Sequence, residues 1–411
     1  MTNEKYSVYF ESQRQFKVFI TMLSTKIRTE NLQDNYSVDL YAGTLHINAG
    51  ASDKSIEGLL SFASRYNEKR QYMFASNVLG KYIPAEPRRI EAAQLALISD
   101  LTLHNEVTTV VGFAESACGL GEAMFHKIVD TNTGLKDKSA YIHTTRQHLP
   151  TDEILIEFKE PHSHAADQVL LKPKSEDISS IMRDSTCLVV VEDEITTGNT
   201  LRNFLCEYFK YHKNIKRLVI LTYVDWRTDS QRLNLSYDFP YLQVQTQCLL
   251  SGNISFDVKK ENKTYEKPEK TAILTQPHYA QYGAKFGKKY SDESLDKTIE
   301  EIRANTSNFS QPMIISGTSE FTYWAQRIAT AVAELGGDVR VLSTTRAPLQ
   351  VGNDIHSKMT FQSHYGDGEE HFLYNLQTDR KLFICYENQH QADAHAALLV
   401  SLDAFGLVKG E

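Results

Sequence analysis

The stretch from residue 188 to residue 200, LVVVEDEITTGNT, places acidic side chains directly after an apolar strand-like run. Glu192 and Asp193 follow the run, and a small polar loop separates them from the helix-like segment LRNFLCEYFK. In an open parallel sheet, ligands bind beyond the carboxyl ends of the strands. We therefore expect Glu192 and Asp193 to face a ligand. The alternative is that they are solvated acids before a capped helix.

The loop after the two acids offers the groups that bind phosphate. Small hydroxyl side chains, a glycine and the start of a helix can present backbone amides to an anion. The residues of this phosphate loop are Thr196, Thr197, Gly198, Asn199 and Thr200. A carboxylate pair beside the loop would repel a bare phosphate, unless it contacts ribose hydroxyls or holds a hydrated Mg²⁺ through water. The combination predicts a sugar phosphate ligand. Glu194 lies beyond the pair and is expected to face solvent.

Two other segments are candidates for contacts to further phosphates. The segment VVGFAESACGLG, residues 110–121, indicates a strand, an exit loop and a helix opened by glycines, although a tight turn for packing is the alternative. The exit loop consists of Ala114, Glu115 and Ser116. Lys81, in LGKYIP after an earlier strand, could neutralise phosphate charge, but lysines are usually solvated.

Strand-like and helix-like segments alternate along the chain, which predicts an α/β fold with a mainly parallel sheet. One sheet of five strands is expected from the segments 71–76, 107–116, 139–146, 187–194 and 216–225. A second alternation predicts a smaller C-terminal α/β domain with strands PMIIS, DVRVLST, EHFLYNL and RKLFICYE, and a closing helix ADAHAALLVSLDAF. No internal repeat is expected. The predicted division is 1–70 for an N-terminal extension or hood, 71–250 for the main domain, 251–310 for a charged connector and 311–411 for the C-terminal domain.

Composition limits the class of protein. The 411 residues suggest two or three domains, and a formal net charge of −8 argues against general affinity for nucleic acid or an anionic membrane. No apolar run approaches the roughly 18 residues that span a bilayer. The N-terminus lacks the features of a secretory signal, which predicts a cytoplasmic protein. The five cysteines have no metal-ligand spacing and are expected to be reduced thiols.

The segment VVVEDEITTGNT resembles the phosphoribosyl pyrophosphate (PRPP) motif of type I phosphoribosyltransferases, in particular the orotate phosphoribosyltransferase-like enzymes. The resemblance implies a central, mainly parallel sheet flanked by helices. It also implies that Glu192 and Asp193 contact the ribose hydroxyls, that residues 196–200 hold the 5-phosphate and that the exit loop and Lys81 contact pyrophosphate. Mg²⁺ as cofactor, PRPP and a base-like acceptor as substrates, and a homodimer follow from the same resemblance.

A subfamily is also indicated. The segments GFAESACGLG, HTTR, EPHSHA and VVVEDEITTGNT occur in an order similar to that of a bacterial phosphoribosyltransferase subfamily found with tellurium-resistance stress genes. Members of that subfamily carry a C-terminal domain named after a Thr-Arg-Ser-Pro (TRSP) motif. The segment STTRAPLQVGNDI resembles it, with Ala347 where the motif has serine. The resemblance covers most of the chain except the first seventy or so residues and the connector.

The loop from 143 to 168 corresponds to the mobile catalytic loop of these enzymes. Arg146 is the candidate pyrophosphate clamp, because a guanidinium can grip phosphate with two parallel hydrogen bonds. His162 and His164 are candidates for proton transfer or for assisting pyrophosphate departure. Two alternatives stay open for these histidines: a metal site together with His143 and His148, or ordinary surface positions.

The C-terminal domain has a possible ligand loop of its own. Gly317, Thr318 and Ser319 lie between a strand and a helix, and Arg346 follows the next strand. This pattern suits a phosphorylated or carboxylated ligand. The alternative is a packing or dimerisation domain whose turns need small residues.

The resemblance implies transfer of ribose 5-phosphate from PRPP to a nitrogen of a base-like acceptor, with release of pyrophosphate, in the synthesis of a nucleoside-like metabolite linked to stress. The acceptor is not indicated by any motif. A different class of function also stays open, namely a regulator that binds PRPP without turning it over.

Overall fold

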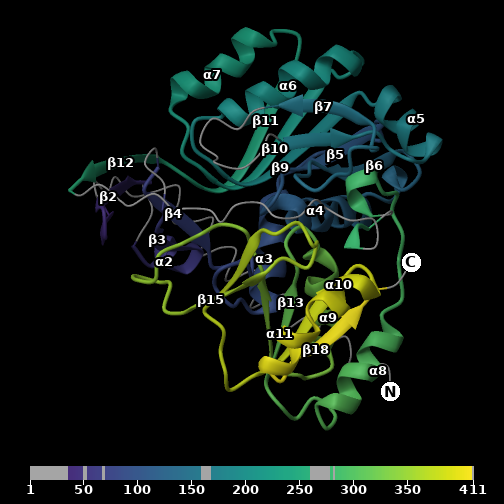
Figure 1. Cartoon of the computed structure of the whole chain (residues 1–411). Helices are drawn as coiled ribbons and strands as arrows, with labels where there is room; N and C mark the ends of the chain where they lie inside the picture. The colour runs from purple at the N-terminus through teal and green to yellow at the C-terminus, as the bar shows by residue number, and fades with distance from the viewer. Residues whose placement is uncertain are drawn as a thin grey trace, which may run out of the picture.

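The computed structural model describes residues 36–49, 53–66, 70–158, 168–259, 278–280 and 283–409. Two parallel sheets dominate these residues, and Figure 1 shows the first above helix α4 (Ala117–Thr131) and the second below it. We call residues 87–251 the first region and residues 296–408 the C-terminal region. Among the described residues, no helix has both the length and the apolar character needed to cross a membrane.

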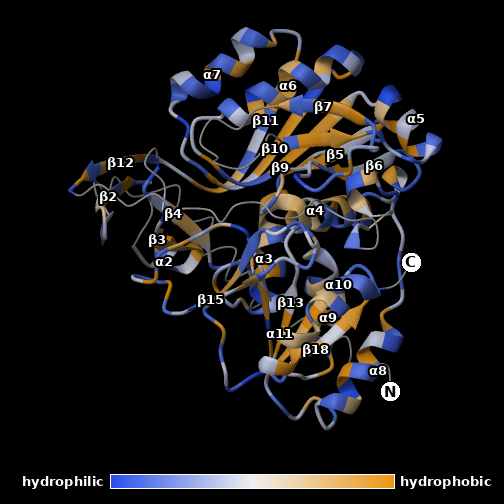
Figure 2. Ribbon diagram, viewed as in Figure 1, coloured by the Kyte–Doolittle hydropathy of each residue, from blue (hydrophilic) through white to orange (hydrophobic). Residues whose placement is uncertain are grey.

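The first region contains a five-stranded parallel sheet of order β11-β10-β9-β5-β6. Its strands are β5 (Thr108–Gly112), β6 (Ser139–His143), β9 (Cys187–Ile195), β10 (Arg217–Asp225) and β11 (Gln243–Ser251). Its helices are α3 (Pro87–Ile98), α4, α5 (Glu176–Asp184), α6 (Asn199–Tyr211) and α7 (Asp229–Asp238), with a 3₁₀ turn at Thr133–Leu135. The central strands are apolar on both faces, as the orange ribbons in Figure 2 show, because α4 covers one face and α5 and α6 cover the other.

Strand pairing corrects one prediction. The segment expected to be the first strand of the sheet forms β4 (Tyr72–Ser76), which pairs antiparallel with β3 (Leu60–Ser64) outside it. The fifth strand of the sheet is β11 instead. Apolar periodicity predicts that a segment is a strand, but it does not determine which strand becomes its neighbour.

The first described residues belong to a small three-stranded antiparallel sheet. β1 (Tyr36–Leu40) and β2 (Gly43–Asn48) pair as a hairpin, and β12 (Asn253–Val258) adds to β2. Helix α2 (Asp53–Leu59) follows β2 in the chain. The beginning of the expected connector is therefore part of the N-terminal sheet.

The C-terminal region contains a four-stranded parallel sheet of order β14-β13-β17-β18. Its strands are β13 (Met313–Gly317), β14 (Val339–Ser343), β17 (Lys381–Tyr386) and β18 (Phe405–Val408). Its helices are α8 (Asp296–Asn305), α9 (Tyr323–Glu334), α10 (Gln389–Ala394) and α11 (Ala396–Ser401), and a 3₁₀ turn at Ala284–Phe286 precedes them. The expected closing helix is broken into α10 and α11, and its last residue belongs to β18.

Each region also carries an antiparallel hairpin outside its sheet. These hairpins are β7 (Ile154–Phe158) with β8 (Gln168–Leu171), and β15 (Lys358–Gln362) with β16 (Glu370–Tyr374). β16, one of the strands expected for the C-terminal domain, therefore lies outside its parallel sheet.

The two regions are packed closely together. Helix α4 packs against α9, and a side chain at Gly119 would lie only 2.0 Å from Oγ1 of Thr322. Ala85 and Val341 exchange two backbone hydrogen bonds, with N–O distances of 2.8 and 2.9 Å. Helix α4 and the segment that precedes α3 therefore lie next to the C-terminal region.

Candidate functional site

The acid pair lies at the carboxyl end of β9. Val191 is buried, whereas Glu192 and Asp193 are half-buried at the edge of the sheet. The amide of Asp193 donates to Oε1 of Glu192 at 3.1 Å. Both carboxylates are thus positioned where the sequence predicted a ligand.

The predicted phosphate loop connects β9 to α6. Gly198 precedes the first residue of α6 and has a φ of 79°, in the left-handed region that favours glycine. The amide of Asn199 donates to Oγ1 of Thr197 at 3.3 Å. Gly198 has no side chain to cap the helix, so the amides of the first turn beyond Asn199 are available to an anion. Buried Arg227, in a two-bonded ion pair with Asp225, lies behind the loop.

Replacing Gly198 with Ala is expected to weaken binding of PRPP about tenfold. The left-handed conformation costs an L-residue roughly 1–2 kcal/mol, so the free loop of the variant would relax out of it. Restoring the loop on binding would then cost about 1.4 kcal/mol, which corresponds to tenfold in affinity. The new methyl group would also lie 3.0 Å from Cδ of Arg227. Titration calorimetry measures the change.

The matched control is Gly336→Ala. Gly336 also has a positive φ, of 91°, but nothing lies within 4 Å of the position that a Cβ atom would occupy, and it follows α9 in the C-terminal region. It should lose stability without losing PRPP affinity. Equal affinities of both variants for PRPP would contradict the role of the loop.

Lys81 and the exit loop of β5 meet at the same edge of the sheet. The ammonium of Lys81 lies 3.4 Å from Oε1 of Glu115 and donates to Oγ of Ser116 at 3.2 Å. The Lys81 side chain is only 5% exposed, contrary to the usual position of a lysine. Burial by itself would lower the pKa of Lys81, but the charges of Glu115 and Asp193 raise it above its ordinary value. A charged lysine therefore lies between the exit loop and the acid pair.

Arg346 joins this site from the C-terminal region. Its Nε lies 3.8 Å from Oε2 of Glu115, and its backbone amide donates to the same oxygen at 3.5 Å. Its Nη2 lies 3.9 Å from Oε1 of Glu320. The sequence assigned Arg346 to a ligand of the C-terminal domain, but the structure places it between two carboxylates that belong to different regions.

The other residues of the expected C-terminal ligand loop are largely engaged within the fold. Oγ1 of Thr318 donates to the carbonyl of Cys385 at 2.8 Å. The amide of Ser319 donates to Oγ1 of Thr344 at 3.1 Å, and a side chain at Gly317 would lie 2.8 Å from a backbone oxygen. The amide of Ser319 is therefore not available to an anion. The amide of Ala114 in the exit loop of β5 is engaged in the same way, since it donates to Oγ1 of Thr144 at 2.8 Å.

Arg146 lies at the boundary between the two regions. Its amide donates to Oε1 of Glu320 at 3.1 Å, and Oγ1 of Thr145 donates to Oε2 of the same glutamate at 2.6 Å. The role of the Arg146 side chain as a clamp stays a prediction. His162 and His164 lie outside the described residues.

His143 has partners that the sequence did not indicate. Its Nδ1 lies 3.4 Å from Sγ of Cys118 and 2.8 Å from the carbonyl of Thr144. One ligand atom from each of Cys118, His143 and Glu320 lies within 4.8 Å of the others. Burial raises the pKa of the Cys118 thiol well above its ordinary value. His148, the other histidine of the metal alternative, is not in this group.

Glu194 corrects another prediction. Oε1 of Glu194 lies 2.5 Å from Nη2 of Arg70, and its side chain is only 13% exposed. The β3–β4 pair folds over the strand ends, since the rings of Phe74 and Trp226 lie 5.0 Å apart, and it brings Arg70 to Glu194. No local signal in the sequence connects these two residues.

Two parts of the chain match models of known protein families. Residues 59–253 match the family model described as phosphoribosyl transferase, and residues 282–402 match that of the TRSP domain C-terminal to it. Among curated proteins, none matches the chain. The second match follows the first along the chain, in the order that its description gives.

Solved structures that are similar include three adenine phosphoribosyltransferases. The enzyme from Rhodothermus marinus is 14% identical with a TM-score of 0.30, and the match covers 49% of this chain and 99% of that one. The enzyme from Trypanosoma brucei is 10% identical with a TM-score of 0.34, and the match covers 53% of this chain and 87% of that one. The enzyme from Leishmania tarentolae is 13% identical with a TM-score of 0.32, covering 48% and 86%.

Proposed function

We propose that this chain, a phosphoribosyltransferase-type enzyme, transfers ribose 5-phosphate from PRPP to a nitrogen of a base-like acceptor and releases pyrophosphate. The observation that carries the proposal is the convergence of three separate segments at one sheet edge. These segments are the β9 acids with the loop 196–200, the exit loop of β5, and Lys81. Each supplies the group that one part of PRPP requires.

The proposed roles follow from charge. Glu192 and Asp193 hold the ribose hydroxyls and face the positive charge that develops on the sugar as pyrophosphate departs. Lys81 and the amides of Glu115 and Ser116 hold the pyrophosphate and stabilise its growing negative charge. The amide of Ala114 cannot share this role, because it donates to Oγ1 of Thr144 at 2.8 Å. Glu115 would repel pyrophosphate by itself, but its contacts with Lys81 and Arg346 make it a positioning residue for both cations.

The acid pair also suits Mg²⁺. Two half-buried carboxylates at a solvent-accessible edge offer the hard oxygen ligands that Mg²⁺ prefers, and Mg²⁺ usually keeps several waters. Glu192 and Asp193 would therefore hold the ion through water. When bound with PRPP, the ion would neutralise part of the pyrophosphate charge.

The organisation of the chain is part of the proposal. Residues 1–70 would form a hood, 71–250 the transferase domain, 251–310 a connector and 311–411 the TRSP-like domain of a cytoplasmic homodimer. The packing of β3 and β4 over the strand ends supports the hood. Because Arg346 lies against Glu115 of the same chain, each protomer would hold both cations of its site, Lys81 and Arg346, by itself. The resemblance to the tellurium-resistance subfamily suggests a nucleoside-like product that serves a stress response.

A pyrophosphate-release assay tests this function. The full chain is incubated with PRPP, Mg²⁺ and either a panel of bases or cell extract, with the Asp193→Asn variant as the control. We expect acceptor-dependent release by the wild type and a ribosylated product in mass spectra. Tight PRPP binding without release for any acceptor or extract would contradict an enzyme and favour a PRPP sensor.

A further inference from the structure

The C-terminal region repeats the strand order of the first region. The order β10-β9-β5-β6 in the first sheet corresponds to β18-β17-β13-β14 in the second, and all these strands are parallel. In both regions a helix follows the first strand, and an antiparallel hairpin follows the second. The sequence shows no internal repeat, and this correspondence is a similarity of strand order.

The loops at the strand ends also correspond. Gly112 ends β5 opposite His143, and Gly317 ends β13 opposite Ser343. Starting at these glycines, the sequences are GFAES after β5 and GTSEF after β13. Starting at His143 and Ser343, they are HTTR after β6 and STTR after β14. Each threonine pair begins with the same backbone hydrogen bond. The amide of Thr144 donates to the carbonyl of Gly112, and the amide of Thr344 donates to the carbonyl of Gly317, both at 3.0 Å.

The two regions exchange equivalent contacts. Glu115 of the first region is held by Arg346 in the second threonine-arginine loop. Glu320, which takes the place of Glu115, is held by Thr145 and by the amide of Arg146 in the first such loop. The regions therefore face each other as the two halves of an approximately symmetric pair.

The correspondence assigns a counterpart to the ribose-binding acid. Gly112 lies opposite Val191 in the first sheet, and Ser316 lies opposite Ile384 in the second. Gly317, the counterpart of Gly112, is therefore aligned with Cys385, the residue after Ile384. Asp193 lies two residues beyond Val191, and Glu387 lies two residues beyond Cys385, so Glu387 takes the position of Asp193. A carboxylate thus follows the equivalent strand in each region.

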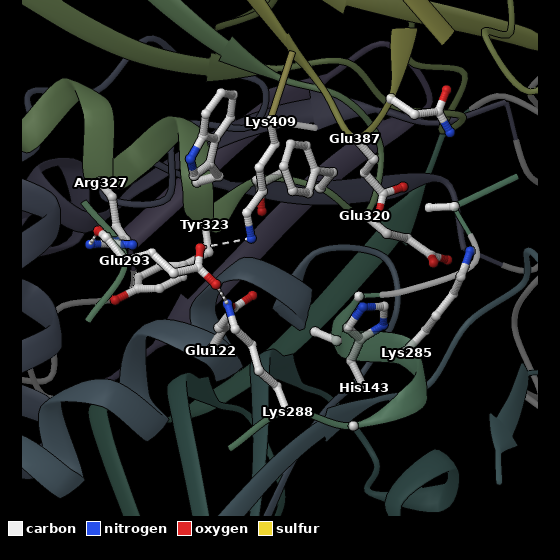
Figure 3. A pocket seen from close by; sticks show the side chains of 18 of the residues that line it. Glu122, His143, Lys285, Lys288, Glu293, Glu320, Tyr323, Arg327, Glu387 and Lys409 are labelled. Atoms are coloured by element: carbon white, nitrogen blue, oxygen red, sulfur yellow. Dashed lines mark hydrogen bonds and ion pairs between the residues drawn. The ribbon is translucent and has the colours of Figure 1, made fainter. Parts of the chain in front are cut away.

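A cavity of about 590 Å³ opens at this second set of strand ends. Glu320 and Glu387 line it together with His143 of the first region, and Phe321, Tyr323 and Tyr365 supply aromatic surface. Figure 3 shows Glu320, Glu387, His143 and Lys285 grouped at one end of the cavity. The volume and the mixture of aromatic and polar groups suit a small organic ligand.

Lys285 is the side chain of this cavity that most strongly indicates a ligand. Lys285 is only 4% exposed. Within the described part of the chain, its ammonium group makes no hydrogen bond and no ion pair. The ammonium lies 3.9 Å from the ring centroid of Tyr279. Burial lowers the pKa of Lys285, although Glu387 and Glu320 oppose this effect. By contrast, Lys288 and Lys409 at the other end of the cavity are paired with Glu293, as the dashed lines in Figure 3 mark.

The second site lacks a phosphate loop. In the first region Gly198 leaves the start of α6 uncapped, whereas Asn388 caps α10 by accepting from the amide of Gln391 at 3.0 Å. The side chain of Gln391 accepts from the amide of Glu387 at 3.1 Å and is fully buried. Protein side chains thus bind the amides that a 5-phosphate would need.

We propose that this cavity binds an unphosphorylated nucleoside as a second ligand, distinct from PRPP. The assignment rests on the proposed function, because Glu387 is given the ribose-binding role of its counterpart Asp193. Glu387 accepts hydrogen bonds from the ribose hydroxyls, Lys285 donates to an oxygen of the ligand, and the base lies against the aromatic side chains. The capped helix start excludes a 5-phosphate.

Titration calorimetry on the full chain tests the site, with adenosine, guanosine, cytidine and uridine as probes. We expect at least one of them to bind with one-to-one stoichiometry, and its 2′,3′-dideoxy counterpart to bind at least tenfold more weakly. Glu387→Gln should weaken that nucleoside at least tenfold and leave PRPP affinity unchanged. Asp193→Asn should do the opposite. No saturable binding by any of the four, or loss of nucleoside binding in Asp193→Asn alone, would overturn the proposal.

A second measurement covers the case in which Glu387→Gln does not fold. Reductive methylation of the wild-type chain, followed by peptide mass spectrometry, reports the accessibility of Lys285. We expect the binding nucleoside to protect Lys285 and to leave exposed Lys213 equally modified. Unchanged modification of Lys285 at a saturating nucleoside concentration would also overturn the proposal. Failure of PRPP turnover would instead show in the pyrophosphate assay, independently of nucleoside binding.

Discussion

Replacing Asp193 with Asn is expected to weaken binding of PRPP in the presence of Mg²⁺ by at least tenfold. Hydrogen bonds to a charged group contribute about 1.5–3 kcal/mol, and about 1.4 kcal/mol corresponds to tenfold in affinity. Asn keeps the size of the side chain but loses the charge that faces the ribose and the metal. Titration calorimetry with PRPP and Mg²⁺ gives the dissociation constant directly.

Asp177→Asn is the matched control for this substitution. Asp177 is an exposed acid in the first turn of α5, so the variant changes the net charge equally without touching the site. Its PRPP affinity should equal that of the wild type. If Asp193→Asn also bound PRPP with wild-type affinity, the assignment of the β9 acids to the ribose would be wrong.

Replacing Arg346 with Leu is expected to lower the free energy of unfolding by about 3 kcal/mol, because two carboxylates that are only 10% and 6% exposed would lose the cation between them. Glu115 would keep Lys81, but Glu320 would lose its neighbouring guanidinium. PRPP affinity should fall as well, since Glu115 and Lys81 would rearrange. Urea unfolding and calorimetry measure the two effects, and Arg346→Lys should restore part of both.

The control for this prediction is Arg340→Leu in the same strand-loop segment. Arg340 lies on β14 and pairs with Asp338 at 3.1 Å and Glu86 at 3.2 Å, and its side chain is 25% exposed. Surface pairs of this kind contribute about 0–1 kcal/mol, so the loss of stability should be small. Similar losses in both variants would argue against a special role of Arg346 between the regions.

The local part of the site was predictable from the sequence. The strand, the acid pair, the phosphate loop and α6 are contiguous, so the residue types between 188 and 200 determine both the structure and the groups that it presents. The exit loop of β5 is predictable for the same reason. That both loops lie at one edge follows from parallel pairing, because all strands of a parallel sheet end on the same side.

Long-range pairing was decided only by the tertiary structure. Periodicity identified β4 as a strand but not its partner β3, and it gave no sign that Arg70 would reach Glu194. It assigned Arg346 to the domain that contains it, although the side chain lies against Glu115 of the other region.

The correspondence between the two sheets shows the same division most clearly. The two regions share a strand order and the short threonine-arginine segments, while their buried strands differ in sequence. Many apolar residues can fill a buried strand, so the apolar pattern preserves the type of element but not a recognisable sequence. The sequence by itself therefore determined one ligand-binding edge of this protein, and the packing of two similar sheets determined which residues complete it.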